Sequence, residues 1–306
     1  MNRGKNKPHR FNSLSELHRV LGLPKPLHPM VSVVNNIDDR IKSYKLTDSF
    51  ILDFYKVSYF TNPSGQFKYG QNLYDFDEGG MFFISPNQIV SNYAEDGDHS
   101  GYTLFIHPDF LLTYPLAKKI KQYGYFSYTS NELLHLSEAE KNTIIAIFKI
   151  IDAELKLPID DLTQEVVISQ IELLLTYSNR FYKRQFVTRK VASSNLLQKL
   201  EEFLEEYFND HTALRKGMPT VQLVSKQMDM SASYFSDMLR TLTGRSAQQH
   251  IQSILIEKAK EKLSATDLSI GEIAYELGFE HSQSFSRLFK AKTKLSPFEF
   301  RQTFIE

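Results

Sequence analysis

Two side chains near the C-terminus, Gln283 and Arg287, have the chemistry to read DNA bases. Glutamine pairs bidentately with adenine, and arginine pairs bidentately with O6 and N7 of guanine. Their four-residue spacing places them on one face of a helix, so both can enter the same groove. Residues 281–301 contain five Lys or Arg residues against Glu299 alone. Positive charge for phosphate contacts is therefore concentrated around this pair.

Catalytic chemistry has much weaker support. The chain has no cysteine, which excludes disulfides, thiol catalysis and Cys-ligated metal. The strand-rich barrel region offers only two histidines as candidate metal ligands, His99 and His107, which are eight residues apart and form no His-x-His pair. No Gly-rich phosphate loop and no Ser–His–Asp pattern stands out. We expect no catalytic residue, no cofactor and no metal.

The composition describes a globular protein of about two domains. Of 306 residues, 42% are hydrophobic and 24% are charged, at roughly 150 residues per domain. The net charge of zero argues against a broadly basic nucleic-acid binder but allows a local basic face. The basic N-terminus lacks an apolar stretch after it, and no run of about 18 apolar residues occurs. We expect a cytoplasmic protein without a membrane segment.

The N-terminal region has a residue pattern typical of β-strands. Short runs rich in aromatic residues lie at 50–57, 81–84 and 101–106, and segments with Gly, Pro and Asn separate them. This pattern predicts an antiparallel sandwich or barrel. Residues 1–12 are polar and basic and are predicted to be mobile, whereas residues 14–23 favour a short helix.

Two amphipathic helices are predicted after the strands, at about 137–156 and 162–182. Ser137 and Glu140 form a capping-box pattern at the start of the first helix. The apolar stripe of the second helix includes Val166, and Leu173, Leu174 and Leu175 widen it. This apolar surface predicts a homodimer. The alternative is that both helices simply pack on the barrel. The apolar stripes are Ile144, Ile147, Phe148, Ile151 and Leu155, then Val166, Val167, Ile171, Leu174 and Leu175.

These elements divide the chain into three parts. Residues 1–182 are the expected sensing and dimerisation domain, 183–195 a basic linker, and 196–306 an all-α domain. The segment 179–190 has five positive charges and no acids. It is suited to phosphate contacts, or it is simply a solvated linker.

The C-terminal part contains two similar helix pairs. In the first pair, Thr220 can cap one helix, Ser231 starts another, and Gly244 ends it. In the second, Ser269 can cap a helix that ends near Gly278, and residues 281–292 follow as a second helix. A longer helix at about 247–263 connects the pairs, and the repeat interval is about fifty residues. Each pair has the proportions of a helix-turn-helix.

The residues of the second pair resemble a known family. The run IGEIAYELGFEHSQSFSRLFK at 270–290, followed by SPFEFR at 296–301, resembles the signature of AraC/XylS transcription regulators of bacteria. This resemblance implies a cupin-like N-terminal barrel with trailing helices, a double helix-turn-helix, and double-stranded DNA and RNA polymerase as partners. It also implies a small-molecule effector in the barrel. One departure is Lys294, where the family has Gly; its backbone must adopt a strained positive φ or another geometry.

Candidate sites follow from the outward helix positions and from the resemblance. The base-reading candidates are Ser233, Ser236, Asp237, Ser282, Gln283, Ser286 and Arg287. The phosphate-contact candidates are Arg240, His281 and Lys290. The effector-pocket candidates are Tyr55, Tyr59, Tyr69, Tyr74 and Phe82.

We therefore expect an α+β two-domain protein that regulates transcription, as an activator or a repressor, in response to a small molecule. Two alternatives stay open: a cupin-type metal enzyme, and a regulator that acts without a ligand.

Overall fold

The computed structural model describes residues 8–35, 50–61, 67–69, 72–74, 80–90, 100–129, 132–188 and 190–304. At 67–69, 72–74 and 190–195 only the backbone is described. The chain divides into two compact units, Met1–Gln185 and Phe186–Glu306. The first is mixed α/β and the second is all helical, as expected. No described helix combines the length and hydropathy needed to span a bilayer.

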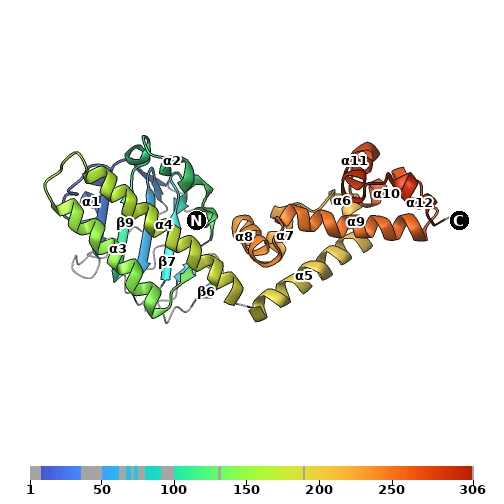
Figure 1. Ribbon diagram of the computed structural model, residues 1–306, viewed down its shortest axis with the longest axis horizontal. Helices are drawn as coiled ribbons and strands as arrows, with labels where there is room; N and C mark the ends of the chain where they lie inside the picture. The colour runs from blue at the N-terminus through green and yellow to red at the C-terminus, as the bar shows by residue number, and fades with distance from the viewer. Residues whose placement is uncertain are drawn as a thin grey trace, which may run out of the picture. The chain divides into compact units, whose positions relative to one another are not determined.

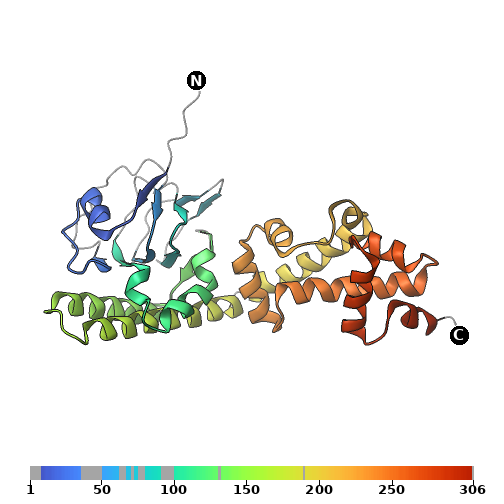
Figure 2. The ribbon, with the colours of Figure 1, turned by 90° about the horizontal axis from the view of Figure 1, so that it is seen from above.

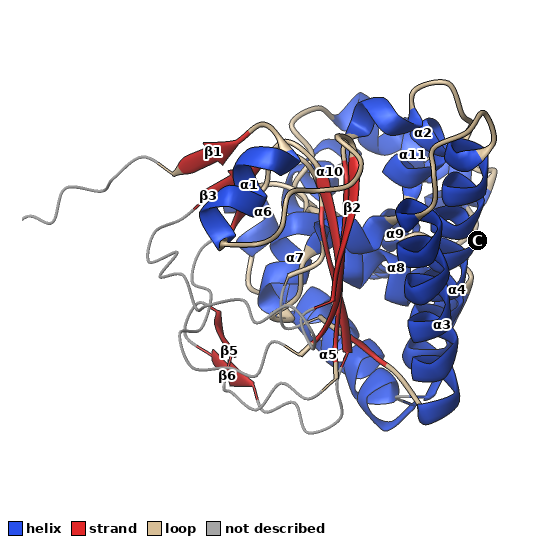
Figure 3. Ribbon diagram, turned by 90° about the vertical axis from the view of Figure 1, so that its left-hand side faces the viewer, coloured by secondary structure: helices blue, strands red, loops and turns tan. Residues whose placement is uncertain are grey.

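A five-stranded antiparallel sheet forms the centre of the first unit. Its order is β10 (Leu134–His135), β7 (Gly80–Ile84), β4 (Tyr55–Phe60), β9 (Gly101–Ile106) and β2 (Val31–Asn35). Every residue of β4 and β9 is buried, because helices cover one face of the sheet and further strands cover the other (Figure 3). Three of these buried residues are polar, namely Lys56, Ser58 and Thr103.

A smaller sheet packs on the second face. It contains β1 (His9–Phe11), β3 (Phe50–Leu52) and β8 (Ile89–Val90), and β1 pairs parallel to β3. Helix α1 (Leu14–Leu21) packs beside it, and β5 (Phe67–Tyr69) pairs with β6 (Asn72–Tyr74). The prediction that residues 1–12 are mobile is wrong at 9–11. Phe11 is fully buried there, and Arg10 pairs with Asp53 at 2.6 Å.

The strands that the structure describes form the two packed sheets and the separate β5–β6 pair, and they do not by themselves close a barrel. Short helical turns lead from β9 to β10. They are η1 (Pro108–Leu111), α2 (Leu116–Lys119), η2 (Ile120–Gln122) and η3 (Gly124–Ser127).

Helices α3 (Glu138–Lys156) and α4 (Thr163–Thr188) lie across the first face of the large sheet (Figure 1). The predicted capping box forms between Ser137 and Glu140. The predicted stripe of α3 is buried throughout. In α4, Val166 departs from the predicted stripe because its side chain is 37% exposed.

Helix α4 continues beyond its predicted end at Tyr182. Arg184 pairs with Glu140 at 2.7 Å and donates to the carbonyl of His135. The side chain of Gln185 accepts from the N–H of His135 and donates to the carbonyl of Leu133. These bonds hold residues 183–185 on the first unit. The segment expected as a linker, 183–195, is thus helical on both sides of residue 189. Helix α4 ends at Thr188, and α5 (Lys190–Asn209) begins at Lys190.

The second unit is built around α9 (Ala247–Ala265), which connects two helix pairs (Figures 1 and 2). One pair is α7 (Val221–Gln227) and α8 (Ala232–Thr243), and the other is α10 (Ile270–Glu276) and α11 (Ser282–Thr293). Helices α5, α6 (Thr212–Lys216) and α12 (Pro297–Gln302) complete the unit. A single apolar cluster runs through all of them, including Leu204, Leu255 and Phe289.

Candidate nucleic-acid interface

The second helix pair is held by a tight turn. Ser269 and Glu272 form a capping box at the start of α10. Gly278 then adopts φ +87°, and a Cβ there would lie 2.6 Å from both the carbonyl carbon of Gly217 and the nitrogen of Met218. Phe279 packs beneath the turn at 6% exposure. Glycine at 278 is therefore required both by its φ angle and by this close approach.

Helix α11 has one buried and one exposed face. Phe285 and Phe289 are fully buried in the core, as predicted. Gln283 and Arg287 are exposed on the opposite face. Ser286 is half-buried, and its hydroxyl donates to the carbonyl of Ser282 at 3.0 Å. The two long side chains are therefore the ones that extend furthest into solvent.

The start of α11 favours an anion. His281 is its N-cap residue but makes no side-chain capping bond, and it is exposed. Backbone N–H groups at such a helix start attract phosphate. Lys290 is exposed on the same helix, and its charge contributes to a lowered pKa of Glu299, after the hydrogen bonds from Ser296.

The polar side chains on the first helix pair are shorter than those on α11. Ser231 caps α8 by accepting from the N–H of Tyr234. Ser233, Ser236 and Asp237 are half-buried. The Ser236 hydroxyl donates to the carbonyl of Ala232 at 2.7 Å, so it serves its own helix.

Two further residues of α8 lie on opposite sides of the helix, one exposed and one buried. Arg240 is exposed and is its only long cationic candidate among the predicted residues. Tyr234 was not singled out in the sequence, yet it is 4% exposed and adds to the buried face of α8.

The helix ends differ between the pairs. Gly244 caps α8 with φ 72°, and Lys294 caps α11 with φ 70°. The positive φ anticipated at Lys294 is therefore present. A non-glycine residue in this left-handed region costs about 1–2 kcal/mol.

Arg301 counted among the local positive charges, but its Nε donates to the carbonyl of Leu263 at 3.2 Å. This bond ties α12 to the end of α9. Arg301 thus has a structural contact inside the unit, whereas Arg287 and Lys290 are exposed on α11.

The effector candidates fall on opposite faces of the large sheet. Tyr55 and Tyr59 are buried on the helix-covered face, where Tyr55 contacts Phe126 at 5.1 Å between ring centroids. Burial raises the pKa of both tyrosines. Phe82 is opposite Ser58 in the β4–β7 register and faces the smaller sheet. The side chains of Tyr69 and Tyr74 lie outside the described residues.

The structure gives no support to a metal site at the two candidate histidines. His99 lies outside the described residues. His107 is the N-cap of η1 and accepts from the N–H of Asp109. Among the described residues, no group of three His, Asp or Glu side chains is arranged to hold a metal ion.

Comparison with known proteins identifies the helical unit. A family model described as a helix-turn-helix domain matches residues 224–303. The C-terminal region is an AraC-type helix-turn-helix domain.

Several curated proteins are similar to this chain. The uncharacterized HTH-type transcriptional regulator YfiF of Bacillus subtilis is 24% identical over 82% of this chain and 77% of its own length. RafR, the raffinose operon transcriptional regulatory protein of Pediococcus pentosaceus, is 22% identical over 86% of this chain and 90% of its own. RhaS, an HTH-type transcriptional activator of Salmonella schwarzengrund, is 31% identical over 45% of each chain.

Among solved structures, the C-terminal domain of the two-component response regulator yesN from Fusobacterium nucleatum is 29% identical to this chain. It covers 35% of this chain and 98% of its own, with a TM-score of 0.31.

Proposed function

We propose that this protein is a sequence-specific DNA-binding transcription regulator, and that α11 is its main reading helix. The observation that carries the proposal is the exposed pair Gln283 and Arg287 on a helix anchored by Phe285 and Phe289. This helix is the second of a helix-turn-helix, the position that enters the major groove.

In this proposal each exposed side chain has a chemical role. Gln283 pairs with adenine and Arg287 with guanine, while His281 and Lys290 contact phosphates. In the first pair, Ser233, Ser236 and Asp237 make shorter contacts, and Arg240 contacts phosphate. Ser282 and Ser286 border the α11 surface. The resemblance to AraC/XylS regulators supports RNA polymerase as a partner of the DNA-bound protein.

The test is to select DNA sites with the full chain and to measure Arg287→Ala on the best site and on single-base variants. We expect a loss of about 1–3 kcal/mol that is confined to one base position. Lys290→Ala is the matched control, because a lost phosphate contact weakens binding to all sequences equally. An equal loss across all sequences for Arg287→Ala would reduce this residue to a phosphate contact.

The effector is proposed to bind between the two sheets, beside Phe82. Lys56 is 5% exposed on this face, and its Nζ lies 5.5 Å from the centroid of the Phe82 ring. Nearby, Ser58 and Thr103 share a hydrogen bond of 3.0 Å. These polar groups give the face the donors and acceptors that fix a ligand's orientation. Tyr55 and Tyr59 support the packing of the opposite face.

A ligand screen by thermal shift tests this effector site. A compound at 100 times its dissociation constant stabilises the chain by about 2.7 kcal/mol. Phe82→Ala should abolish that shift, whereas Tyr177→Ala, on α4, should preserve it. If no compound that binds the chain is sensitive to Phe82→Ala, the site is elsewhere.

A homodimer through α3 and α4 is the second part of the proposal. Leu174 and Leu175 are fully buried against the sheet, so they do not form the dimer face. The exposed apolar side chains of α3 and α4 are Ile150 at 47%, Val166 at 37%, Leu173 at 41% and, near the end of α4, Val187 at 46%. Val166 and Leu173 are seven residues apart and share one face of α4. Their exposure supports a second copy as the covering partner.

Light scattering on the full chain tests the dimer. Leu173→Asp should shift the mass towards a monomer without lowering the melting temperature. Leu174→Asp is the matched control, because a buried charge there should unfold the unit instead. A wild-type monomer at tens of micromolar would refute the dimer and leave the DNA-reading proposal intact.

A further inference from the structure

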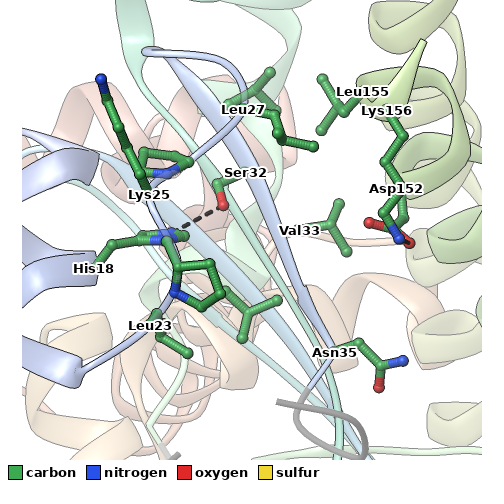
Figure 4. Close-up of a pocket in the computed structure, with 14 residues that line it drawn as sticks. His18, Leu23, Lys25, Leu27, Ser32, Val33, Asn35, Asp152, Leu155 and Lys156 are labelled. Carbon is green, nitrogen blue, oxygen red and sulfur yellow. Dashed lines mark hydrogen bonds and ion pairs between the residues drawn. The ribbon is translucent and has the colours of Figure 1, made fainter.

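Two histidines differ in how their buried ring nitrogens are satisfied. His18 is 5% exposed and lines a cavity of about 280 Å³ beside β2. Its Nδ1 lies 2.6 Å from the carbonyl oxygen of Pro24, and its Nε2 lies 2.9 Å from the hydroxyl oxygen of Ser32 (Figure 4). Both ring nitrogens of His250 are shielded from solvent as well, but neither has a hydrogen-bond partner among the residues that the structure describes. Since a buried polar group without a partner destabilises the folded state, His250 requires a reason beyond packing.

His250 lies in the first turn of α9, beside the connection to α8. Its N–H donates to the carbonyl of Ser246, the residue that caps α9, at 3.0 Å. The adjacent Ile251 is buried in the apolar cluster that includes Leu200 of α5 and Leu239 of α8. Helix α9 contacts both of these helices. Opening the turn at His250 would therefore loosen the packing between α9, α5 and α8.

The surroundings of His250 favour its neutral form. Burial has the largest effect and lowers the pKa of His250, and the guanidinium of Arg245 lowers it further. The carboxylate of Glu201 on α5 raises the pKa but does not offset burial. Lys199 and Glu202, beside it on α5, are exposed. The start of α9 acts in the same direction as burial, because free N–H groups at a helix N-terminus repel a cation.

The other charged groups around α9 are engaged elsewhere. No other side chain of residues 246–256 ionises. On α8 the charged residues are Asp237 and Arg240, which belong to the proposed DNA surface. Helices α10 and α12 contact α9 near its other end, where Lys262 pairs with Glu276 at 2.6 Å. That pair is about 18 Å from the histidine, at 1.5 Å per residue along the helix.

We propose that His250 is an acid-sensitive switch, whose protonation opens the start of α9 and releases the first helix pair from DNA. The closed form holds the imidazole neutral, whereas the open form exposes it to water, where it takes up a proton. The closed form is therefore fully stable above the ordinary histidine pKa of 6.5 and loses stability as pH falls towards its own lower pKa. The second helix pair stays folded, since it contacts the other end of α9. The DNA part of this inference rests on the proposed function.

Hydrogen exchange of the full chain, followed by mass spectrometry at pH 7.5 and pH 5.5, tests the opening. After correction for intrinsic rates, wild-type residues 243–252 should exchange severalfold faster at the lower pH, and the turn at Gly278 should be unchanged. His250→Phe keeps an aromatic ring that cannot take up a proton, so its exchange should be independent of pH. His250→Gln is a second variant that does not titrate.

The matched control is His211→Asn, in the same domain. His211 is exposed, with φ 54°, and asparagine tolerates that left-handed backbone. This variant should retain the acid-dependent exchange of the wild-type chain, because it leaves His250 in place.

Affinity for a selected DNA site, measured over the same pH range, tests the consequence. His281 is a proposed phosphate contact whose protonation would strengthen binding, so His281→Gln is the background for this comparison. In this background acid should weaken binding severalfold, and adding His250→Phe should remove that loss. Failure to bind any DNA at either pH would refute the proposed function, while hydrogen exchange would still test the opening.

Two results would overturn the switch. One is exchange in residues 243–252 that does not respond to acid in the wild-type chain, or that responds equally in His250→Phe and His250→Gln. The other is an acid-dependent loss of DNA affinity that is absent, or that is the same with and without His250→Phe.

Discussion

The two helix-turn-helix units of the second domain share one plan but differ at their turns. In the first unit the left-handed turn residue is Asp229, with φ 55°, and it is exposed. In the second it is Gly278, with φ 87°, and the backbone at residues 217–218 lies where a Cβ would be. A turn free of neighbours tolerates a side chain, whereas a turn wedged against another segment does not.

The reading helices differ in the same direction. The turn before α8 spans 228–231 and ends in a serine that caps the helix, whereas the turn before α11 spans 277–281 and ends in uncapped His281. Ser236 of α8 and Ser286 of α11 each donate to a carbonyl of their own helix, and α11 in addition presents Gln283 and Arg287 to solvent. The more constrained unit therefore also has the longer side chains for base contacts.

The largest expected effect is at the two turns. Gly278→Ala should destabilise the second domain by about 3 kcal/mol or more, because it combines left-handed strain with an overpacked contact. Asp229→Ala should cost about 1 kcal/mol or less, since its side chain is exposed and non-glycine residues already fit there. Urea unfolding of both variants measures the difference. Similar losses at both positions would contradict the contrast between the turns.

The reading helices should differ in their contribution to specificity. Gln283→Ala should lose about 1–3 kcal/mol at one adenine position, while Ser233→Ala should lose less than about 1 kcal/mol at any position. Competition binding against single-base variants of a selected site gives both values. A greater loss from Ser233→Ala would assign the principal reading role to the first unit.

The residues that cap the C-terminal ends of α8 and α11 can be exchanged between the two units. Lys294→Gly should stabilise the domain by about 1 kcal/mol, and Gly244→Lys should destabilise it by about the same amount. Thermal and urea unfolding test the two variants in parallel. If Lys294→Gly leaves stability unchanged, the left-handed backbone at this position costs nothing in its context.

The smallest effect concerns pH. Helices α10 and α12 have capping boxes with Glu272 and Glu299, whereas α9 uses uncharged Gln249. Hydrogen bonds from Ser269 and Ser296 lower the pKa of these two carboxyl groups.

Their stabilisation is therefore complete above the unfolded pKa, near 4.3, and is lost as pH falls through the lower folded pKa. Melting temperatures between pH 6 and pH 3 should fall less steeply in the double variant Glu272→Gln and Glu299→Gln. Gln249→Ala should lower the melting temperature equally across that range.

Much of the second domain could be predicted because its determinants are local. The buried phenylalanines of α11, the caps at Thr220 and Ser269, and the strained Lys294 all follow from residues within one or two helical turns. The same local logic located Gly278 at its turn, although the approach of residues 217–218 was not visible in the sequence.

The first domain was harder because its determinants are distant in the chain. Strand β1 is held in place by buried Phe11 and by the ion pair between Arg10 and Asp53. The residues around Phe11 are polar and Asp53 is distant in the chain, so the sequence alone does not indicate this strand. Phe82 faces away from Tyr55 only through the register between β7 and β4. The sequence also does not show which of the three consecutive leucines on α4 points outward. In the structure Leu174 and Leu175 are buried and Leu173 is exposed.

The contact behind Gly278 also provides an intrinsic reporter. The amide of Met218 donates to the carbonyl of Gly278 at 3.2 Å, across a gap of sixty residues in sequence. Its hydrogen exchanges with solvent only when the turn between α10 and α11 lifts from the residues beneath it. The exchange rate of that one amide therefore measures how often this turn, and with it the start of the reading helix, opens in the absence of DNA.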